Sequence, residues 1–314
     1  MKIAFFECKE EERSFFEKAL SGEELFFFNE TINEVLHPKN ALHVSFDYDV
    51  ISVFVHSKID EALLQKLPNL KYIQTRSTGY NHLLCKDIYK NGLLLSNVSG
   101  YAGPAVAEFS FSLLLNATRK TDVALQRAKE GDFHYDDLKG IELFGKKLGV
   151  LGLGTIGIQM VRIGKGFGMD VHVYSRSHKP IIDELGLDFV SLDTILKDSD
   201  IIMLALPLTP DTTSLINQNN ASLIKKDAII VNAARAELIE NSLYEALENS
   251  ICLDGDNPLH VKENLLFTPH MAYYTKEALG RIMAISLLNI EAFLQNRALP
   301  NCLYLECKRN YKEQ

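Results

Sequence analysis

Residues 148–179 read LGVLGLGTIGIQMVRIGKGFGMDVHVYSRSHK, and this stretch decides the fold. It holds an apolar strand, three glycines spaced as GxGxxG, a helical run to Phe167 and a second apolar strand at 171–174. In this arrangement the first glycine permits a tight turn, the second lets backbone approach a pyrophosphate, and the third lets the helix pack on the strand. The stretch therefore predicts a dinucleotide site, with a glycine-rich structural turn as the plainer alternative. Its cofactor-binding residues would be Gly152, Gly154, Thr155, Ile156 and Gly157.

Short β-branched and aromatic runs alternate with helical stretches on both sides of this unit, which is typical of parallel sheets covered by helices. We expect strands at 2–7, 25–29, 50–56, 71–76 and 93–97 in the first part of the chain. We expect further strands at 147–152, 171–174, 201–206, 228–232, 251–254 and 265–268. The fold class is therefore α/β, with two doubly wound parallel-sheet domains, a Rossmann nucleotide-binding domain being inserted into a flavodoxin-like domain.

The domain crossover is predicted near residue 100. A long apolar helix is expected from Pro104 to Thr118, because proline suits the first turn of a helix. The last periodic segment, at 276–294, is long enough to run back across the first domain. We therefore assign residues 1–100 and 272–314 to one domain and residues 101–271 to the nucleotide-binding domain.

Composition excludes several classes of protein. The 314 residues are 46% hydrophobic and carry a formal net charge of −8 at pH 7, which argues against binding to nucleic acid or to an anionic membrane. No apolar run approaches the roughly 20 residues of a membrane span, and the N-terminal apolar stretch is too short for a signal peptide. The five cysteines show no CxxC pair and no interleaved histidines. We expect reduced thiols, no metal site and a cytoplasmic protein.

The end of the second strand bears on the choice of cofactor. An NAD-selective fold usually has an acidic residue there for the ribose 2′-hydroxyl, but this chain has Ser175, Arg176 and then Lys179. A guanidinium without a neighbouring carboxylate suits a 2′-phosphate. The segment favours NADP over NAD, and its bland alternative is a solvated loop.

Two candidate catalytic residues follow later strands. Arg235 comes just after the strand expected at 228–232, and His270 just after the strand expected at 265–268. An arginine can bind a carboxylate and polarise a carbonyl, and a histidine can transfer a proton near neutral pH. With a dinucleotide, these groups suffice to reduce a 2-oxo acid. The alternative for both is a role in surface salt bridges or capping.

Most of the chain resembles the D-isomer-specific 2-hydroxyacid dehydrogenases. The matching stretches, in order, are RSTGYN at 76–81, NV at 97–98 with VAE at 106–108, the glycine loop, LPLTPDT at 206–212, NAAR at 232–235 and TPH at 268–270. The resemblance implies that Arg235 binds substrate and that His270 is the general acid in reduction. It implies that Ser77, Thr78 and Gly79 hold the substrate carboxylate through backbone N–H groups, where a plain turn is the alternative. It further implies cofactor contacts from Val106, Leu206, Pro207, Thr212, Ala233, Asp254 and His270.

The chain departs from the family pattern before His270, which lies only 35 positions after Arg235. The family's Glu-Pro pair, whose carboxylate is paired with the catalytic histidine, is missing, and residues 251–258 read ICLDGDNP. Asp256 would replace that glutamate with a shorter reach, or Asn257 would occupy the position without charge. A neighbouring negative charge stabilises the imidazolium form of a histidine, so loss of the glutamate should make His270 harder to protonate. We therefore expect activity that favours reduction, with an optimum at lower pH than in a relative that has the glutamate.

These observations predict an oxidoreductase that transfers a hydride between NAD(P)H and a small 2-oxo acid such as glyoxylate, hydroxypyruvate or pyruvate, with 3-phosphohydroxypyruvate as an outlier. The alternative is a dinucleotide-sensing binding protein on the same fold, which the missing glutamate favours. The resemblance also implies a homodimer, formed through the helix from Pro104 and residues 124–144.

Overall fold

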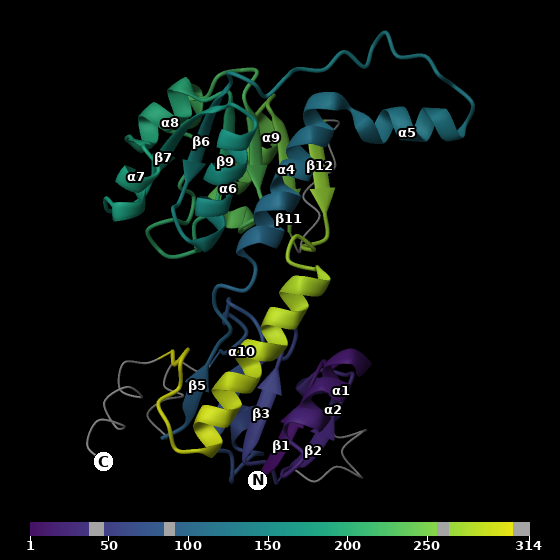
Figure 1. Ribbon diagram of the computed structural model, residues 1–314, viewed down its shortest axis with the longest axis vertical. Coiled ribbons are helices and arrows are strands. Elements are labelled where there is room, and N and C mark those ends of the chain that lie inside the picture. Colours follow the sequence, from purple (N-terminus) through teal and green to yellow (C-terminus); the bar gives the residue numbers. More distant parts are fainter. Residues whose placement is uncertain (38–46, 85–91, 256–263, 304–314) are drawn as a thin grey trace. The chain divides into compact units, whose positions relative to one another are not determined.

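The computed structural model describes residues 1–37, 47–84, 92–255 and 264–303. The chain divides into two compact units, Met1–Tyr101 with Lys276–Gln314 and Ala102–Thr275, which we name the first unit and the second unit. Each unit is a parallel β-sheet with helices packed on its faces (Figure 1). Two parallel-sheet α/β domains are the architecture that the sequence predicts, and the fold class is confirmed.

The first unit has a five-stranded sheet in the order β2-β1-β3-β4-β5. Its alternating side chains fill two cores, since Ile3 and Phe5 pack on one face of β1 while Ala4 and Phe6 pack on the other. Helix α10 covers the Ile3 face, where Phe293 stacks on Tyr72 with ring centroids 4.8 Å apart. The strands are β1 (Lys2–Phe5), β2 (Glu24–Phe27), β3 (Val50–Val53), β4 (Tyr72–Thr75) and β5 (Leu94–Ser96), and the helices are α1 (Glu10–Ala19), α2 (Ile32–Val35), α3 (Glu61–Leu64) and α10 (Lys276–Leu294).

The second unit has a seven-stranded sheet in the order β12-β11-β10-β9-β6-β7-β8. Helices α4 and α6 pack on one face, where Phe111 and Met160 share a core with Val150, and α8 and α9 pack on the other. The strands are β6 (Lys147–Leu151), β7 (Asp170–Tyr174), β8 (Asp188–Phe189), β9 (Ile201–Leu204), β10 (Ile229–Asn232), β11 (Ser250–Asp254) and β12 (Leu265–Thr268). The helices are α4 (Gly103–Arg119), α5 (Thr121–Lys129), α6 (Thr155–Gly166), α7 (Pro180–Glu184), α8 (Leu192–Asp198) and α9 (Asn241–Ala246), with 3₁₀ turns η3 (Ala221–Leu223) and η4 (Ala236–Leu238).

Several strands end earlier than the sequence pattern predicts. The apolar run at 50–56 forms a strand only to Val53, because the Glu7 carboxylate accepts hydrogen bonds from the N–H groups of Phe54, His56 and Ser57. Strand β9 likewise ends at Leu204 rather than at 206. The residues that leave the sheet at these carboxyl ends form the loops in which ligands of parallel sheets bind.

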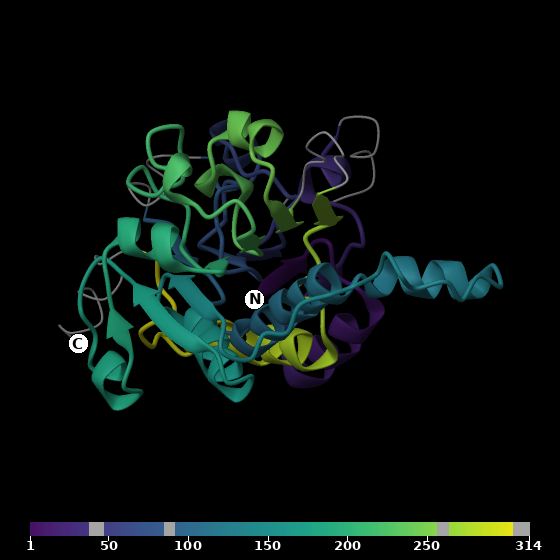
Figure 2. The same ribbon diagram turned by 90° about the horizontal axis from the view of Figure 1, so that it is seen from above.

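Helix α5 was not expected from the pattern. None of its residues is buried, so it presents no apolar stripe to a core. It projects from the rest of the second unit in both views (Figures 1 and 2).

Candidate active site

The glycine-rich loop joins β6 to α6, and its positions require glycine for different physical reasons. A Cβ on Gly152, whose φ is +102°, would lie 2.7 Å from the Ala205 carbonyl oxygen, and a Cβ on Gly157 would lie 1.9 Å from the Gly152 carbonyl oxygen. Packing therefore requires both glycines. Gly154 is exposed, and a Cβ there would meet no heavy atom within 4 Å. Packing does not explain this glycine, whereas a pyrophosphate approaching the N-terminus of α6 would.

A basic segment follows β7. The Ser175 side chain is buried, and its hydroxyl donates to the Ser177 carbonyl oxygen at 2.6 Å. Arg176 is exposed. Lys179 Nζ donates to the Leu153 carbonyl oxygen at 2.8 Å, so a cation lies against the glycine-rich loop. Lys179 belongs to the basic cluster that the sequence predicts, but no sequence signal indicates this contact, because Leu153 is 26 positions away.

The loop after β9 carries three of the predicted cofactor residues. Leu206 is half-buried and Pro207 is exposed. Thr212 is buried, and its hydroxyl donates to the Pro207 carbonyl oxygen at 2.6 Å while it accepts from the Thr209 N–H at 2.8 Å. The hydroxyl proton of Thr212 is thus used to shape the loop, so a contact with a pyrophosphate would have to use a remaining lone pair or its methyl group.

Two more predicted cofactor residues lie in one apolar cluster. Val106, at the start of α4, packs with Ala233 and Ala272, and the half-buried Ile156 packs against this cluster. The cluster joins four segments of the second unit that are far apart in the sequence. Thr155, the first residue of α6, is exposed.

Arg235 follows β10 in a turn that Asn232 holds. The buried Asn232 amide donates to the Arg235 carbonyl oxygen at 2.8 Å and accepts from the Ala234 N–H at 3.1 Å. The half-buried guanidinium makes one hydrogen bond, from Nη1 to the Ala234 carbonyl oxygen at 2.7 Å. A guanidinium has five N–H donors, so four have no partner in the part of the chain that the structure describes. Such a fork suits a carboxylate.

His270 follows β12 with a φ of +47°, in the left-handed region. Its Nδ1 lies 3.4 Å from the Asp254 carbonyl oxygen. The Asp254 carboxylate, 1% exposed, accepts hydrogen bonds from Thr268 Oγ1 and from the backbone N–H groups of Met271 and Ala272. The family resemblance implies a cofactor contact for Asp254, and the structure shows that its carboxylate holds the turn of His270. Asp256, the predicted replacement for the family glutamate, lies outside the described residues.

In the first unit, the loop after β4 contains Ser77, Thr78 and Gly79. The Ser77 hydroxyl donates to the Gly79 carbonyl oxygen, the Thr78 hydroxyl donates to the Val98 carbonyl oxygen, and Asn97 donates to the Thr78 carbonyl oxygen, at 2.6–2.8 Å. The backbone N–H groups of Thr78 and Gly79 make no hydrogen bond within the described ranges. A fixed loop with open N–H groups suits a carboxylate, as predicted for it.

These groups are distributed over two sheet edges. All paired strands are parallel, so the glycine-rich loop, Arg235 and His270 lie along the carboxyl edge of the second unit's sheet. Ser77–Gly79 lies at the carboxyl edge of the first unit's sheet.

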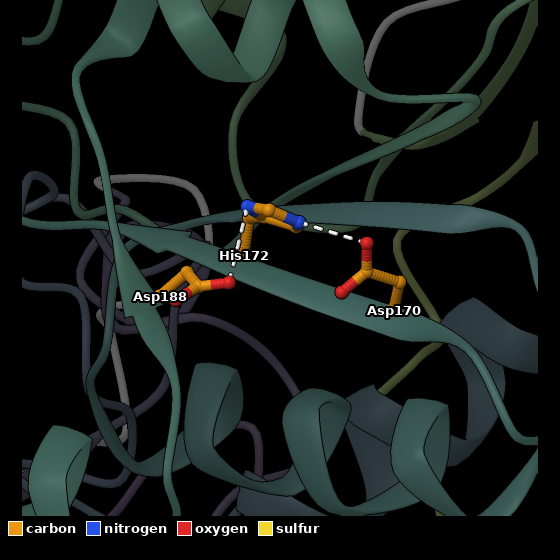
Figure 3. A group of neighbouring side chains, drawn as sticks. All are labelled: Asp170, His172 and Asp188. Atoms are coloured by element: carbon orange, nitrogen blue, oxygen red, sulfur yellow. Dashed lines mark ion pairs between the residues drawn. The ribbon is translucent and has the colours of Figure 1, made fainter.

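A separate group of possible metal ligands comprises Asp170, His172 and Asp188 (Figure 3). His172 Nε2 lies 3.1 Å from the Asp170 carboxylate, whereas Nδ1 lies 4.0 Å from the Asp188 carboxylate. The two ring nitrogens thus face different carboxylates, and one ligand atom from each of the three residues lies within 4.8 Å of the others. The histidine lies between two acids and links β7 to the edge strand β8, and the sequence did not predict this group of possible ligands.

Comparisons with known proteins agree with the geometry. The family model of the D-isomer specific 2-hydroxyacid dehydrogenase NAD binding domain matches residues 111–272. The glyoxylate reductase of Aeropyrum pernix is 32% identical over 279 residues, which cover 82% of this chain and 83% of that protein. The apo structure of Escherichia coli D-lactate dehydrogenase has a TM-score of 0.85 at 29% identity and covers 97% of this chain and 100% of that chain. Aquifex aeolicus D-lactate dehydrogenase, complexed with NAD and lactic acid, has a TM-score of 0.84, also at 29% identity, and covers 96% of this chain and 98% of that chain.

No helix within the described ranges is both long and apolar enough to cross a bilayer.

Proposed function

Since the chain belongs to the D-isomer-specific 2-hydroxyacid dehydrogenase family, we propose that it reduces small 2-oxo acids to D-2-hydroxy acids, with NADPH preferred over NADH. Family membership makes it a 2-hydroxyacid oxidoreductase with a nicotinamide dinucleotide as cofactor. The substrate, the preferred dinucleotide and the residue roles are the proposal. The observation that carries it is Arg235, whose guanidinium lies at a ligand-binding sheet edge with four N–H donors that have no partner among the described residues.

The chemistry is divided among the chain's own residues. When bound, the reduced dinucleotide supplies the hydride for the keto carbon. Arg235 binds the carboxylate side of the substrate and polarises the carbonyl. His270 donates a proton to the carbonyl oxygen, so that a 2-oxo acid, a hydride and a proton give a 2-hydroxy acid. The open N–H groups of Thr78 and Gly79 hold the substrate carboxylate.

The test is the loss of reduced-nicotinamide absorbance with purified protein, run with NADPH and NADH against glyoxylate, hydroxypyruvate, pyruvate and 3-phosphohydroxypyruvate. We expect turnover that disappears in His270→Ala, while the affinity for the dinucleotide is retained. Cofactor binding without reduction of any acid would contradict the proposal. It would favour the alternative, a dinucleotide-sensing binding protein, in which His270→Ala leaves ligand binding unchanged.

The preference for NADPH rests on Arg176. It is exposed directly after β7, and residues 175–179 contain no carboxylate that would repel a 2′-phosphate. We expect Arg176→Ala to lower the ratio of kcat/KM for NADPH to that for NADH by about tenfold, the loss of about one charge-assisted hydrogen bond. Arg162→Ala, an exposed arginine on α6, is the control and should leave the ratio unchanged. An unaltered ratio in Arg176→Ala would assign the arginine to a solvated loop.

Phosphorylated acids fit poorly. In the first unit, Arg76 lies next to the Ser77–Gly79 loop that we propose to bind the substrate carboxylate. It is completely buried, and all its N–H donors are hydrogen-bonded to the protein. It cannot also bind a substrate phosphate. We therefore propose the unphosphorylated acids as substrates, and the assay with glyoxylate, hydroxypyruvate, pyruvate and 3-phosphohydroxypyruvate tests this directly.

The expected homodimer is also proposed. The projecting helix α5 and the segment after it expose Leu125, Phe133 and Phe144, whose side chains are 64%, 78% and 78% exposed. Apolar surface of this kind is typical of a subunit interface. We expect a dimer by analytical ultracentrifugation and a monomer for Leu125→Asp with Phe133→Asp, whereas Phe189→Asp on β8 should leave the dimer intact.

We also propose a cytoplasmic location, because the described thiols of Cys8, Cys252 and Cys302 form no disulfide.

A further inference from the structure

The turn that carries His270 has a backbone conformation that needs support. A φ of +47° lies in the left-handed region, which is unfavourable for a residue other than glycine, and such a residue persists only where its surroundings determine it. No glycine or asparagine is used at this position, so the imidazole itself is required in a conformation that the chain would not adopt alone.

The support comes from one side chain. The Asp254 carboxylate accepts a hydrogen bond from the backbone N–H of Met271 at 2.9 Å and another from that of Ala272 at 2.9 Å. Thr268 Oγ1 donates to the same carboxylate at 2.7 Å. The two N–H groups are those that directly follow His270, so the carboxylate fixes the chain on the far side of the left-handed residue. On the near side, the His270 N–H donates to the Thr268 carbonyl oxygen at 2.9 Å.

The burial of this carboxylate needs a cause. Asp254 is 1% exposed, and in the described residues it pairs with no cation. A buried carboxylate is costly unless hydrogen bonds compensate for the lost water, and here all three donors belong to the His270 turn. An apolar residue at the end of β11 would fill the space at lower cost, but it would leave the N–H groups of Met271 and Ala272 unpaired.

The Asp254 main chain acts on the imidazole directly. Its carbonyl oxygen lies 3.4 Å from His270 Nδ1, and a carbonyl oxygen can only accept, so Nδ1 carries the proton. In the neutral ring, Nε2 is then the unprotonated nitrogen, and in the imidazolium Nε2–H is the group available to a substrate oxygen. The carbonyl thus sets the tautomer in the way that an orienting acid does for a catalytic histidine.

We propose that Asp254 is the positioning residue of His270, its carboxylate holding the left-handed turn and its carbonyl oxygen fixing Nδ1–H, so that Nε2 exchanges the proton with the substrate. Thr268 assists by donating to the carboxylate. The proposal rests on the proposed function for the proton transfer. The placement of the ring can be tested without turnover.

The first experiment reads the ring. The full-length chain labelled with ¹⁵N-histidine should show His270 as the Nδ1–H tautomer in its neutral form, with assignment by loss of the signal in His270→Ala. The amides of Met271 and Ala272 should be protected from hydrogen exchange in the wild type and exchange about 10-fold faster in Thr268→Val, because one of the three supporting hydrogen bonds is lost. An Nε2–H tautomer, or equal exchange in the variant, would overturn the proposal.

The second experiment reads the reaction. Thr268→Val should lower kcat about tenfold and Asp254→Asn about 100-fold, with the affinity for NADPH unchanged, because a displaced catalytic group slows the chemical step. In Asp254→Asn, the amide N–H groups would face the backbone donors. Thr268→Ser keeps the hydroxyl and should restore kcat. Asp200→Asn is the matched control, since Asp200 accepts from the Lys147 N–H at the opposite edge of the same sheet and should affect stability only.

The outcomes separate the two ideas. If Thr268→Val and Asp254→Asn keep the wild-type kcat and lose only stability, as Asp200→Asn does, the positioning role is overturned. If they lower the affinity for NADPH and leave kcat unchanged, Asp254 is a cofactor contact instead. If the wild type reduces no acid, the proposed function fails, and the tautomer and amide exchange still decide the placement of His270.

Discussion

Two arginines of this chain follow parallel strands at ligand-binding sheet edges, yet their surroundings differ completely. Arg76, after β4, is fully buried, and Arg235, after β10, is half-buried. All five N–H donors of Arg76 are used: Nε donates to the Glu12 carboxylate, Nη1 to the Ser52 carbonyl and hydroxyl, and Nη2 to the carbonyls of Phe6 and Glu7. Among the described residues, the Arg235 guanidinium makes one hydrogen bond, to the neighbouring Ala234 carbonyl oxygen.

The difference shows that the state of the donors, not the position of the residue, separates a structural arginine from a binding one. Arg76 links β1, β3 and α1 through its hydrogen bonds, so it stabilises the part of the first unit that carries the Ser77–Gly79 loop. Arg235 stands in a turn made rigid by Asn232, with a guanidinium left open for an anion.

The largest effect is expected for Arg235→Gln. Loss of the charged partner of a substrate carboxylate should lower kcat/KM by about 10³-fold, as removal of one member of a buried charge pair does. Because the guanidinium supports little of the fold, the free energy of unfolding should stay within about 0.5 kcal/mol of the wild type. Steady-state kinetics with the best 2-oxo acid and urea denaturation measure the two quantities.

A conservative variant sharpens this prediction. Arg235→Lys keeps the charge and loses the two-pronged geometry, so its kcat/KM should lie between those of the wild type and Arg235→Gln. An Arg235→Gln protein that retains wild-type kcat/KM would remove Arg235 from the binding site and erase the contrast with Arg76.

The second prediction concerns Arg76→Met. This change leaves the Glu12 carboxylate and the carbonyls of Ser52, Phe6 and Glu7 without their donor, so it should destabilise the first unit by about 3–5 kcal/mol. Hydrogen exchange of the amides in β1, β3 and β4 reports the unfolding of that unit separately from the second. A stable Arg76→Met protein with a large increase in the KM for the acid would make Arg76 a ligand-binding arginine, like Arg235.

The contrast also shows what the sequence could predict. The alternation of strands and helices gave the fold class and the bounds of α10, because an amphipathic run of 19 residues is a strong periodic signal. The glycine loop, Arg235 and His270 could be named because their motifs are local. The state of Arg76 could not be foreseen, since its partners are 24–70 positions away and become neighbours only when the sheet forms.

Other features escaped prediction for related reasons. The early end of β3 depends on the carboxylate of Glu7, which lies 47–50 positions before the N–H groups that it accepts from. Helix α5 has only nine residues and none of them is buried, so its pattern is too short and too weakly tied to a core to predict a helix. The support of His270 by Asp254 combines two strand ends that pair in register, Asp254 with Thr268, which only the sheet brings together.

A smaller effect is expected for Glu12→Gln, which tests whether Arg76 needs the negative charge of Glu12. Glu12 Oε1 lies 3.1 Å from Arg76 Nε, and the glutamate side chain is 18% exposed. The amide keeps an acceptor but removes the charge, so the first unit should lose about 1–2 kcal/mol. Glu17→Gln, in the exposed pair with Arg13 on the same helix, is the control and should change stability by less than about 0.5 kcal/mol. If both variants lost the same free energy of unfolding, the buried Arg76–Glu12 pair would stabilise the fold no more than the exposed Arg13–Glu17 pair.

The loop after Arg76 also depends on a chain of hydrogen bonds that begins at His82. The Ser77 hydroxyl gives its proton to the Gly79 carbonyl oxygen, so Thr75 Oγ1 must donate to Ser77, and His82 Nε2–H must donate to Thr75 at 2.9 Å. Burial lowers the pKa of His82 from its usual 6.5, and the fold therefore favours the neutral ring. As the pH falls through 6.5, the unfolded chain binds a proton that the folded chain resists, so this histidine contributes a loss of stability at acidic pH.

The smallest effect is therefore expected for His82→Gln, whose amide can still donate to Thr75 but does not titrate. Near pH 7.5 its free energy of unfolding should lie within about 0.5 kcal/mol of the wild type. Between about pH 7.5 and about pH 5.5 the wild type should lose more stability than the variant, because only the wild type contains the titrating ring. Urea denaturation across this range measures the difference, and His134→Gln, an exposed histidine, is the control. If the free energy of unfolding had the same pH dependence in the wild type and in His82→Gln, the Ser77–Gly79 loop would not need the neutral imidazole. Arg76 alone would then stabilise the structure around this loop.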